Sequence, residues 1–187
     1  MTRATLAGLG FSWLGGCILP GSETGDTTAE TGADTGTGAS PDATIVYALR
    51  HAEKDEDADD GDPGLTEEGT ERALALADLM HEVPLVAIYA TELRRTQDTV
   101  APTAADHGLT VLTDIDPEAD LAAYILLVDA GESVLACGHS YTVPGFIEAL
   151  GIDDPPSADD YGDLWIITVE ADGTASLEAS RYGDDEE

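Results

Sequence analysis

The stretch Thr44-Ile45-Val46-Tyr47-Ala48-Leu49-Arg50-His51-Ala52-Glu53-Lys54 places an apolar run directly before a cluster of charged and titratable side chains. Residues 44–49 are rich in β-branched and apolar side chains, which predicts a buried first strand. Arg50, His51 and Lys54 follow this run. Ligands of open α/β sheets collect outside the carboxyl ends of the strands. We therefore expect a binding site where residues 50–54 leave the sheet.

Further along the chain, short apolar runs alternate with segments of helical period. Strands are predicted over residues 85–89, 111–112, 133–137, 164–169 and 174–179, and helices over 66–80, 92–107, 119–129 and 143–150. Thr66 is the expected N-cap of the first helix, and Pro102 is expected to kink or break the second. Asp172-Gly173 is a hairpin turn signal between the last two strands. The order predicts a three-layer α/β/α sandwich with a mostly parallel central sheet and an antiparallel C-terminal edge.

Polar side chains follow two other strands of this predicted sheet. Residues 90–96 (ATELRRT) come after the second strand, and Gly138-His139-Ser140 come after the strand that ends at Cys137. The carboxyl ends of parallel strands share one edge, so two histidines and several arginines should meet there. Arginine forms bidentate, charge-assisted hydrogen bonds with phosphate oxygens. We also expect the helix near Val143 to direct backbone amides at the same place. The pattern indicates a site for a phosphoryl group.

Composition limits the classes of partner. The chain has 187 residues, 39 Asp plus Glu against 7 Lys plus Arg, and a formal net charge of −32. Nucleic-acid binding requires clustered basic residues, so the balance argues against nucleic acid and against a polybasic membrane patch. Four of the basic residues nevertheless form two groups, Arg50 with Lys54 and Arg94 with Arg95, as a local anion pocket would require. Arg72 and Arg94 are expected to be solvated helix charges.

The N-terminus reads as an export signal. One positive charge, an apolar stretch and Leu14-Gly15-Gly16-Cys17 resemble a bacterial lipoprotein signal peptide whose Cys17 is acylated. The predicted domain plan is a signal peptide over 1–17, a flexible acidic Gly/Thr-rich tether over 18–43, one catalytic domain over 44–183 and an acidic tail over 184–187. The expected location is extracytoplasmic, anchored to a bacterial membrane through Cys17 only, the outer membrane being favoured over the inner. Cys137 is expected to be a small buried residue.

Four motifs resemble the histidine phosphatase (phosphoglycerate-mutase-like) superfamily, in its short phosphatase branch. Residues 49–54 (LRHAEK) look like the family's Arg-His-Gly signature in an Arg-His-Ala form, and residues 65–69 (LTEEG) match its "LTxxG" helix start. Residues 89–99 (YATELRRTQDT) match "YsSxLxRTxxT", and residues 138–140 are similar to its last "GHS". The motifs occur in family order between about residues 44 and 150.

The resemblance implies roles for particular residues. His51 is the phosphorylated nucleophile, Arg50 and Arg95 clamp the phosphate, and His139 completes the pocket. Arg95 is preferred to Arg94 by its spacing within the motif. Possible substrate contacts are Lys54, which could instead pair with a neighbouring acid, and Ser140. The family's proton donor has no clear match here; Asp114 is the first candidate, followed by Asp116 and Glu118.

The predicted function is therefore phosphomonoester hydrolysis through a phosphohistidine at His51, acting on a small phosphorylated substrate without metal or cofactor. Two alternatives remain open: a non-catalytic lipoprotein that binds a phosphorylated ligand in the same pocket, and a phosphohistidine-protein phosphatase. A phosphatase is preferred to a mutase because the chain lacks the long insertions of the glycolytic mutases. The acidic segment 55–62 is interpreted as a solvated loop, since its glycine and closing position do not fit a calcium-binding loop.

Overall fold

The computed structural model describes residues 42–183 apart from 57, 59–60 and 115–117. Six strands and four helices alternate in this part of the chain. In chain order they are β1 (Thr44–Arg50), α1 (Glu67–Met80), β2 (Leu85–Ala90), α2 (Arg94–His107), β3 (Val111–Leu112), α3 (Glu118–Val128), β4 (Ser133–Gly138), α4 (Val143–Ala149), β5 (Asp163–Val169) and β6 (Ala175–Arg181). The predicted signal peptide with Cys17, the tether before residue 42 and the tail over 184–187 lie outside the described residues.

All six strands form one sheet in the order β3-β2-β4-β1-β5-β6. The neighbours among β3, β2, β4 and β1 pair in parallel, whereas β5 pairs antiparallel with both β1 and β6. A mostly parallel sheet with an antiparallel C-terminal edge is the predicted architecture, and it is confirmed. The central strand β1 reads as a continuous apolar run because it is covered on both faces.

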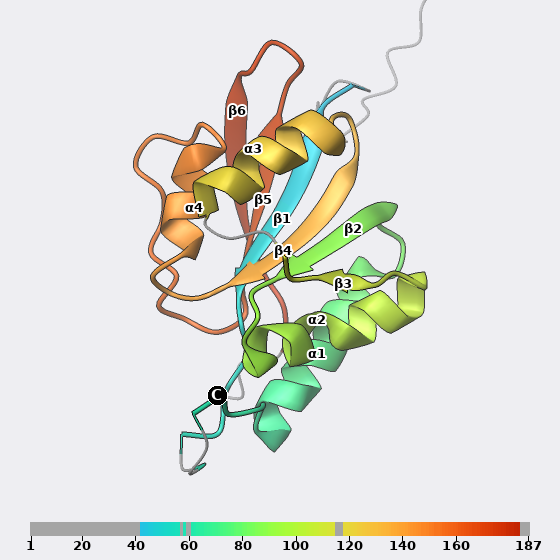
Figure 1. Cartoon of the computed structure of the whole chain (residues 1–187), viewed down its shortest axis with the longest axis vertical. Helices are drawn as coiled ribbons and strands as arrows, with labels where there is room; N and C mark the ends of the chain where they lie inside the picture. Colours follow the sequence, from blue (N-terminus) through green and yellow to red (C-terminus); the bar gives the residue numbers. More distant parts are fainter. Residues whose placement is uncertain (1–41, 57, 59–60, 115–117, 184–187) are drawn as a thin grey trace, which may run out of the picture. The chain divides into compact units, whose positions relative to one another are not determined.

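Helices cover the two faces of the sheet, with α1 and α2 on one side and α3 and α4 on the other (Figure 1). Each face has its own apolar core. Leu76 and Met80 of α1 pack with Val100 of α2 on one face, and Ile125 of α3 packs with Ile147 of α4 on the other. This division gives the α/β/α sandwich its three layers. No helix in the described ranges is both long and apolar enough to cross a bilayer.

Two local predictions about the helices have different outcomes. Thr66 caps α1 as expected, because its Oγ1 accepts a hydrogen bond from the Gly69 N–H at 3.0 Å. Pro102, however, does not break α2, which continues from Arg94 to His107. Thr99, Val100 and Thr103 are fully buried on the same helix. We attribute the continuity to this packing, which outweighs the loss of the one hydrogen bond that proline cannot donate.

Candidate active site

The register of the sheet places the two predicted site histidines beside each other. Arg50, the last residue of β1, pairs with Gly138, the last residue of β4. His51 directly follows β1 and His139 directly follows β4, and the His51 N–H donates to the Gly138 carbonyl at 3.0 Å. Their ring centroids are 5.4 Å apart. Two imidazoles 88 positions apart in the chain therefore meet at the carboxyl edge, because parallel strands end together.

His51 is buried and its ring is held in one orientation. It is 4% exposed, and its Nδ1 lies 2.7 Å from the carbonyl oxygen of Ala52. A carbonyl can only accept, so Nδ1 carries the hydrogen and Nε2 carries the lone pair. The Ala52 N–H is itself fixed by a hydrogen bond to Oγ1 of Thr99 at 2.9 Å. The segment after β1 thus presents a neutral imidazole with a free basic nitrogen.

Burial also keeps His51 unprotonated. Desolvation lowers its pKa to about 4, and the positive charges of Arg95, Arg50 and Lys54 act in the same direction. The hydrogen bond to Ala52 opposes this shift without cancelling it. A histidine must be neutral to act as a nucleophile, so the environment suits that role near neutral pH.

His139 has a similar environment and a different partner. It is 3% exposed, and its Nε2 lies 3.0 Å from Oγ1 of Thr91, the residue after β2. Its buried Nδ1 has no hydrogen-bond partner among the described residues. Burial, followed by the charges of Arg95, His51 and Arg50, lowers its pKa to about 4. An unpartnered buried nitrogen beside His51 indicates a place for a polar ligand atom.

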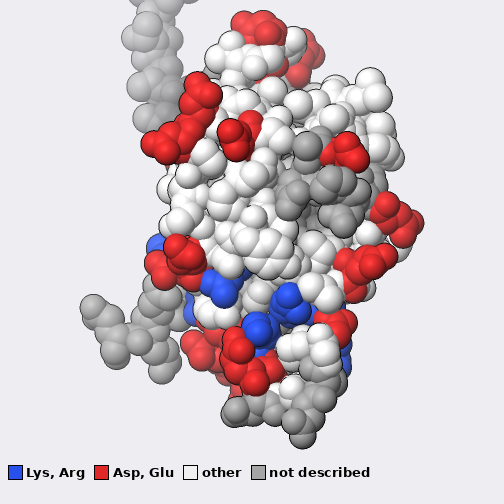
Figure 2. All heavy atoms as spheres, turned by 60° about the vertical axis from the view of Figure 1, so that its left-hand side comes forward, with Lys and Arg blue, Asp and Glu red and all other residues white. Residues whose placement is uncertain are grey.

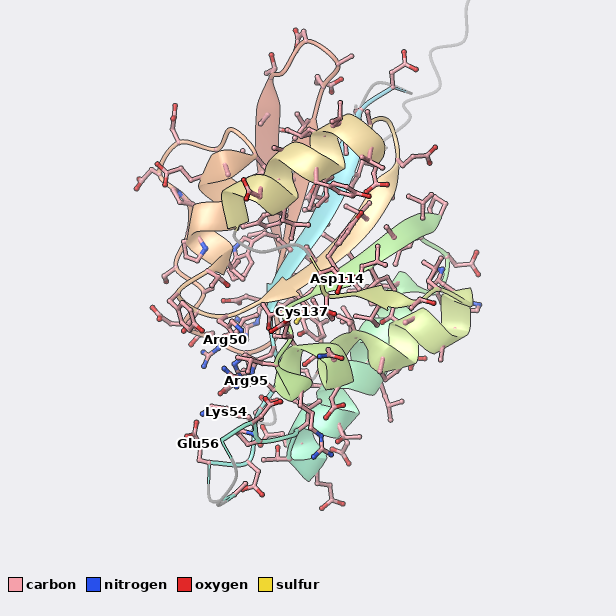
Figure 3. The ribbon with its side chains drawn as sticks, in the orientation of Figure 1. Arg50, Lys54, Glu56, Arg95, Asp114 and Cys137 are labelled. Atoms are coloured by element: carbon pink, nitrogen blue, oxygen red, sulfur yellow. The ribbon has the colours of Figure 1, made fainter. Side chains whose placement is uncertain are left out.

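Arg50 and Arg95 supply buried donors at the same edge, where Figure 3 labels both. Nε of each guanidinium is buried without a hydrogen-bond partner among the described residues. Other donors are in use: Arg50 contacts the Asp159 carbonyl and lies 3.2 Å from the Tyr161 hydroxyl, while Arg95 Nη1 lies 4.0 Å from Asp62. We call Arg50, His51, Arg95 and His139 the histidine–arginine cluster. Its unsatisfied donors fit an oxyanion.

The charges around this cluster are mixed. On the face drawn in Figure 2, Lys and Arg gather in one area and Asp and Glu lie around them. Lys54 forms an ion pair with Glu56 at 3.1 Å. Pairing with a neighbouring acid was the alternative to a substrate contact for this residue. Arg94 is exposed and pairs with Asp98 at 3.2 Å, as expected for a solvated helix charge. The histidine–arginine cluster is therefore a small basic spot on an acidic protein.

Two tyrosines flank the cluster, and sequence reasoning missed both. The Tyr161 ring lies under the Arg50 guanidinium at 4.1 Å from the ring centroid. The Tyr141 ring stacks on His139 with centroids 5.2 Å apart and an interplanar angle of 10°. Tyr141 follows Ser140 directly, so its place next to the last motif was a usable signal. Tyr161 comes from the loop before β5, and no local pattern points to it.

The remaining site candidates are not brought into contact with the cluster by any described interaction. Asp114, labelled in Figure 3, is exposed and follows β3, an edge strand that β2 and β4 separate from β1. Asp116 lies outside the described residues, and Glu118 begins α3 with its side chain outside them. Ser140 is partly buried in the turn after β4. The predicted burial of Cys137 is confirmed, and burial raises the pKa of its thiol.

One expectation about this edge is wrong. Arg72 is not solvated: its side chain is 6% exposed and forms an ion pair with Glu53 at 2.8 Å. At the start of α4, where amides were expected to face the site, the Val143 N–H donates instead to the His139 carbonyl at 3.0 Å and Pro144 has no N–H. Arg72 is satisfied by a residue 19 positions earlier, and the Val143 N–H by one four positions earlier.

Gly69 shows why the helix start after β1 has its sequence. A Cβ on this residue would lie 2.2 Å from the Glu53 carbonyl oxygen. The same carbonyl accepts a hydrogen bond from the Thr66 N–H at 2.9 Å. The first turn of α1 therefore packs directly on the segment that carries His51, which explains the close spacing of the two motifs. In the described part of the chain, no three His, Cys, Asp or Glu side chains gather to hold a metal ion.

Comparisons with known proteins agree with this geometry. Residues 46–121 match the model of the Histidine phosphatase superfamily (branch 1). The uncharacterized protein Rv0525 of Mycobacterium tuberculosis is 38% identical over 81 residues, which cover 41% of this chain and 40% of that protein. The match thus spans less than half the length of that relative.

Solved structures extend the likeness to most of the domain. The protein histidine phosphatase SixA, complexed with tungstate, superposes with a TM-score of 0.61 at 20% identity, covering 73% of this chain and 96% of SixA. The mycobacterial glucosyl-3-phosphoglycerate phosphatase Rv2419c gives a TM-score of 0.56 at 15% identity, covering 75% and 98%. At these identities the structures show a shared fold. Residues 46–121 thus resemble the histidine phosphatase superfamily in sequence, and most of the domain has the same fold as these structures.

Proposed function

We propose that this protein is a phosphomonoester hydrolase in which His51 Nε2 attacks phosphorus and forms a phosphohistidine. The proposal rests on one observation. A buried neutral imidazole, with Nδ1 committed to a carbonyl, lies beside two guanidiniums and a second imidazole that have unpartnered buried nitrogens. A nucleophile and a set of anion-binding donors are thereby combined in one place.

Binding of the phosphoryl group follows from the unpartnered donors. Nε of Arg50 and Nε of Arg95 donate to phosphoryl oxygens, and Thr91 donates its hydroxyl hydrogen to His139 Nε2 so that Nδ1–H donates as well. Charge on these oxygens is redistributed in the transition state of phosphoryl transfer. Donors already held in a buried setting stabilise that charge without reorganising.

The reaction then has two balanced steps. His51 Nε2 forms a bond to phosphorus while the ester P–O bond breaks, and the leaving alkoxide takes a proton. Water next attacks the phosphohistidine, the P–N bond breaks, and inorganic phosphate leaves with His51 neutral again. Asp114, Asp116 and Glu118 remain the candidates for the proton donor. An aryl leaving group depends less on this proton, because it is already a weak base.

The comparisons support a phosphatase activity, and the phosphohistidine-protein phosphatase stays open as an alternative. SixA is named as a protein histidine phosphatase and binds tungstate, an oxyanion of phosphate-like shape, and Rv2419c is named as a phosphatase of a phosphorylated sugar acid. Both support hydrolysis in this chain without identifying its substrate. We further propose an extracytoplasmic protein anchored through acylated Cys17; incorporation of labelled palmitate that is lost in Cys17→Ser tests this part separately.

Turnover of 4-nitrophenyl phosphate tests the main proposal. His51→Ala should lower kcat by at least about 10³-fold, while circular dichroism and the unfolding midpoint show that the fold is kept. Acid-quenched wild type should contain no stable phosphoenzyme, and alkali-quenched wild type should contain one, because phosphohistidine is acid-labile. Activity that survives in His51→Ala would refute the mechanism. A wild type that binds phosphate without turnover would instead support the non-catalytic binder.

A further inference from the structure

Four rings form a continuous row across the histidine–arginine cluster. The ring centroids of Tyr161 and His51 are 6.0 Å apart, those of His51 and His139 are 5.4 Å apart, and those of His139 and Tyr141 are 5.2 Å apart. The histidines are buried at the centre, and the tyrosines lie at the two ends. Each histidine of the cluster therefore has a tyrosine ring as a neighbour.

The two tyrosines differ in what they already contact. Tyr161 is occupied, because its ring supports the Arg50 guanidinium at 4.1 Å and its hydroxyl lies 3.2 Å from Arg50 Nη2. Tyr141 is 72% exposed although it stacks on the buried His139. Its ring is thus oriented by the cluster and still largely open to solvent. An aromatic side chain with these properties is suited to stack on a flat ligand.

The charges near the cluster limit the rest of the ligand. Arg95 has Asp62 at 4.0 Å, Lys54 has Glu56 at 3.1 Å, and Arg94 has Asp98 at 3.2 Å. Lys54 and Arg94, which lie outside the phosphoryl contact, and Arg95, which belongs to it, thus each already have a carboxylate nearby, on a protein with a net charge of −32. A second anionic group on the ligand would approach these carboxylates and be repelled.

We propose that Tyr141 determines specificity by stacking on the leaving group, and that the substrate carries one phosphoryl group on an uncharged, flat ring. This inference rests on the proposed function, since it uses the phosphoryl position at His51. It assigns no chemical step to Tyr141. Stacking between aromatic rings adds to the burial of their area, which corresponds to roughly threefold to tenfold in affinity.

The test compares two phosphonates that cannot be hydrolysed. Benzylphosphonate and cyclohexylmethylphosphonate have the same charge and similar size, but only the first has a flat aromatic ring. Because the cyclohexyl group is the more hydrophobic of the two, general apolar burial favours it, and a preference for benzylphosphonate reports stacking. Titration calorimetry with the full chain measures both dissociation constants without requiring turnover.

We expect wild type to bind benzylphosphonate about threefold to tenfold more tightly than cyclohexylmethylphosphonate. Tyr141→Ala should abolish this preference and leave the affinity for inorganic phosphate, which has no ring to contact position 141, unchanged; retained phosphate binding shows that His139 and the arginines are still in place. Tyr141→Phe should keep the preference. 4-Carboxybenzylphosphonate, which adds one negative charge, should bind more weakly than benzylphosphonate.

Equal affinity for the two phosphonates in wild type would overturn the inference, as would a benzyl preference that persists in Tyr141→Ala. Tighter binding of the carboxylated ligand would overturn its second part, the uncharged ring. Failure of the proposed function looks different. In that case neither phosphonate binds, or turnover of 4-nitrophenyl phosphate does not depend on His51, whatever residue stands at position 141.

Discussion

Arg72 and Arg95 are both largely buried arginines near the carboxyl edge of the sheet, and their surroundings differ. Arg72 donates to Glu53 through Nε at 2.8 Å, pairs with it through Nη2 at 2.8 Å, and donates to the Tyr182 carbonyl at 3.3 Å. Arg95 has a single carboxylate, Asp62, at 4.0 Å, and its buried Nε has no partner among the described residues. One arginine is neutralised by the protein itself, and the other keeps donor capacity for a ligand.

The difference separates a structural role from a binding role. A buried charge that is paired and hydrogen-bonded holds segments together. Removing one partner leaves the other charge buried without compensation. A buried donor without a partner lowers the stability of the empty protein, and it is compensated when an anion binds. Arg72 connects the segment after β1 to the residue after β6, whereas Arg95 belongs to the histidine–arginine cluster. Substitutions at the two positions should therefore affect different measurements.

Arg72→Ala should have the largest effect on stability. Loss of the guanidinium leaves the Glu53 carboxylate buried and uncompensated, which costs about 3–5 kcal/mol. Urea unfolding followed by circular dichroism measures the free energy of unfolding. The double variant Glu53→Gln with Arg72→Met removes both charges and should lose clearly less. A double variant as unstable as Arg72→Ala would contradict the role assigned to the ion pair.

Arg95→Ala should affect catalysis instead. Removal of one preorganised donor lowers kcat by about 10²–10³-fold, corresponding to about 2.7–4 kcal/mol, while the free energy of unfolding changes by less than about 1 kcal/mol. Steady-state kinetics with 4-nitrophenyl phosphate and urea unfolding measure the two quantities on the same preparation. A loss of stability equal to that of Arg72→Ala, with kcat retained, would erase the distinction between the two arginines.

Acidification should weaken the empty protein through its two histidines. Their pKa values are about 4 in the folded state against about 6.5 when unfolded, so between pH 7 and pH 5 the unfolded state takes up protons that the folded state does not. The free energy of unfolding therefore falls over this range. In His51→Asn and in His139→Asn the fall should be smaller by on the order of 1 kcal/mol each. An unchanged fall would show that these imidazoles are protonated in the fold.

Arg94→Ala should have the smallest effect and serves as the control for Arg95. Its side chain is 62% exposed and pairs with Asp98 one helical turn away. Exposed pairs of this kind contribute about 0.3–0.5 kcal/mol. We expect a change in unfolding free energy within that range and a kcat close to that of wild type. A large loss of activity in Arg94→Ala would reverse the choice between the two neighbouring arginines.

Local patterns predicted the elements of this fold well, and their failures share one cause. Apolar runs located the strands, and Thr66 located the start of α1, because such signals depend on neighbours in the chain. Arg72 has no such signal, since Glu53, which neutralises it, lies 19 positions earlier and Tyr182 lies 110 positions later. Pro102 was expected to kink or break α2. The helix continues past it, and its buried face packs on the rest of the protein.

The sequence by itself determined which residues end the strands, and hence that Arg50, His51 and His139 stand at one edge of a largely parallel sheet. Only the tertiary structure decided which nitrogen of His51 is free, which arginine keeps an unpartnered donor, and that Tyr141 and Tyr161 lie beside the imidazoles. The physical reason is the distance along the chain over which each interaction acts. Strand ends follow from local hydrophobicity, whereas desolvation, charge compensation and ring contacts depend on groups that folding brings from distant parts of the chain.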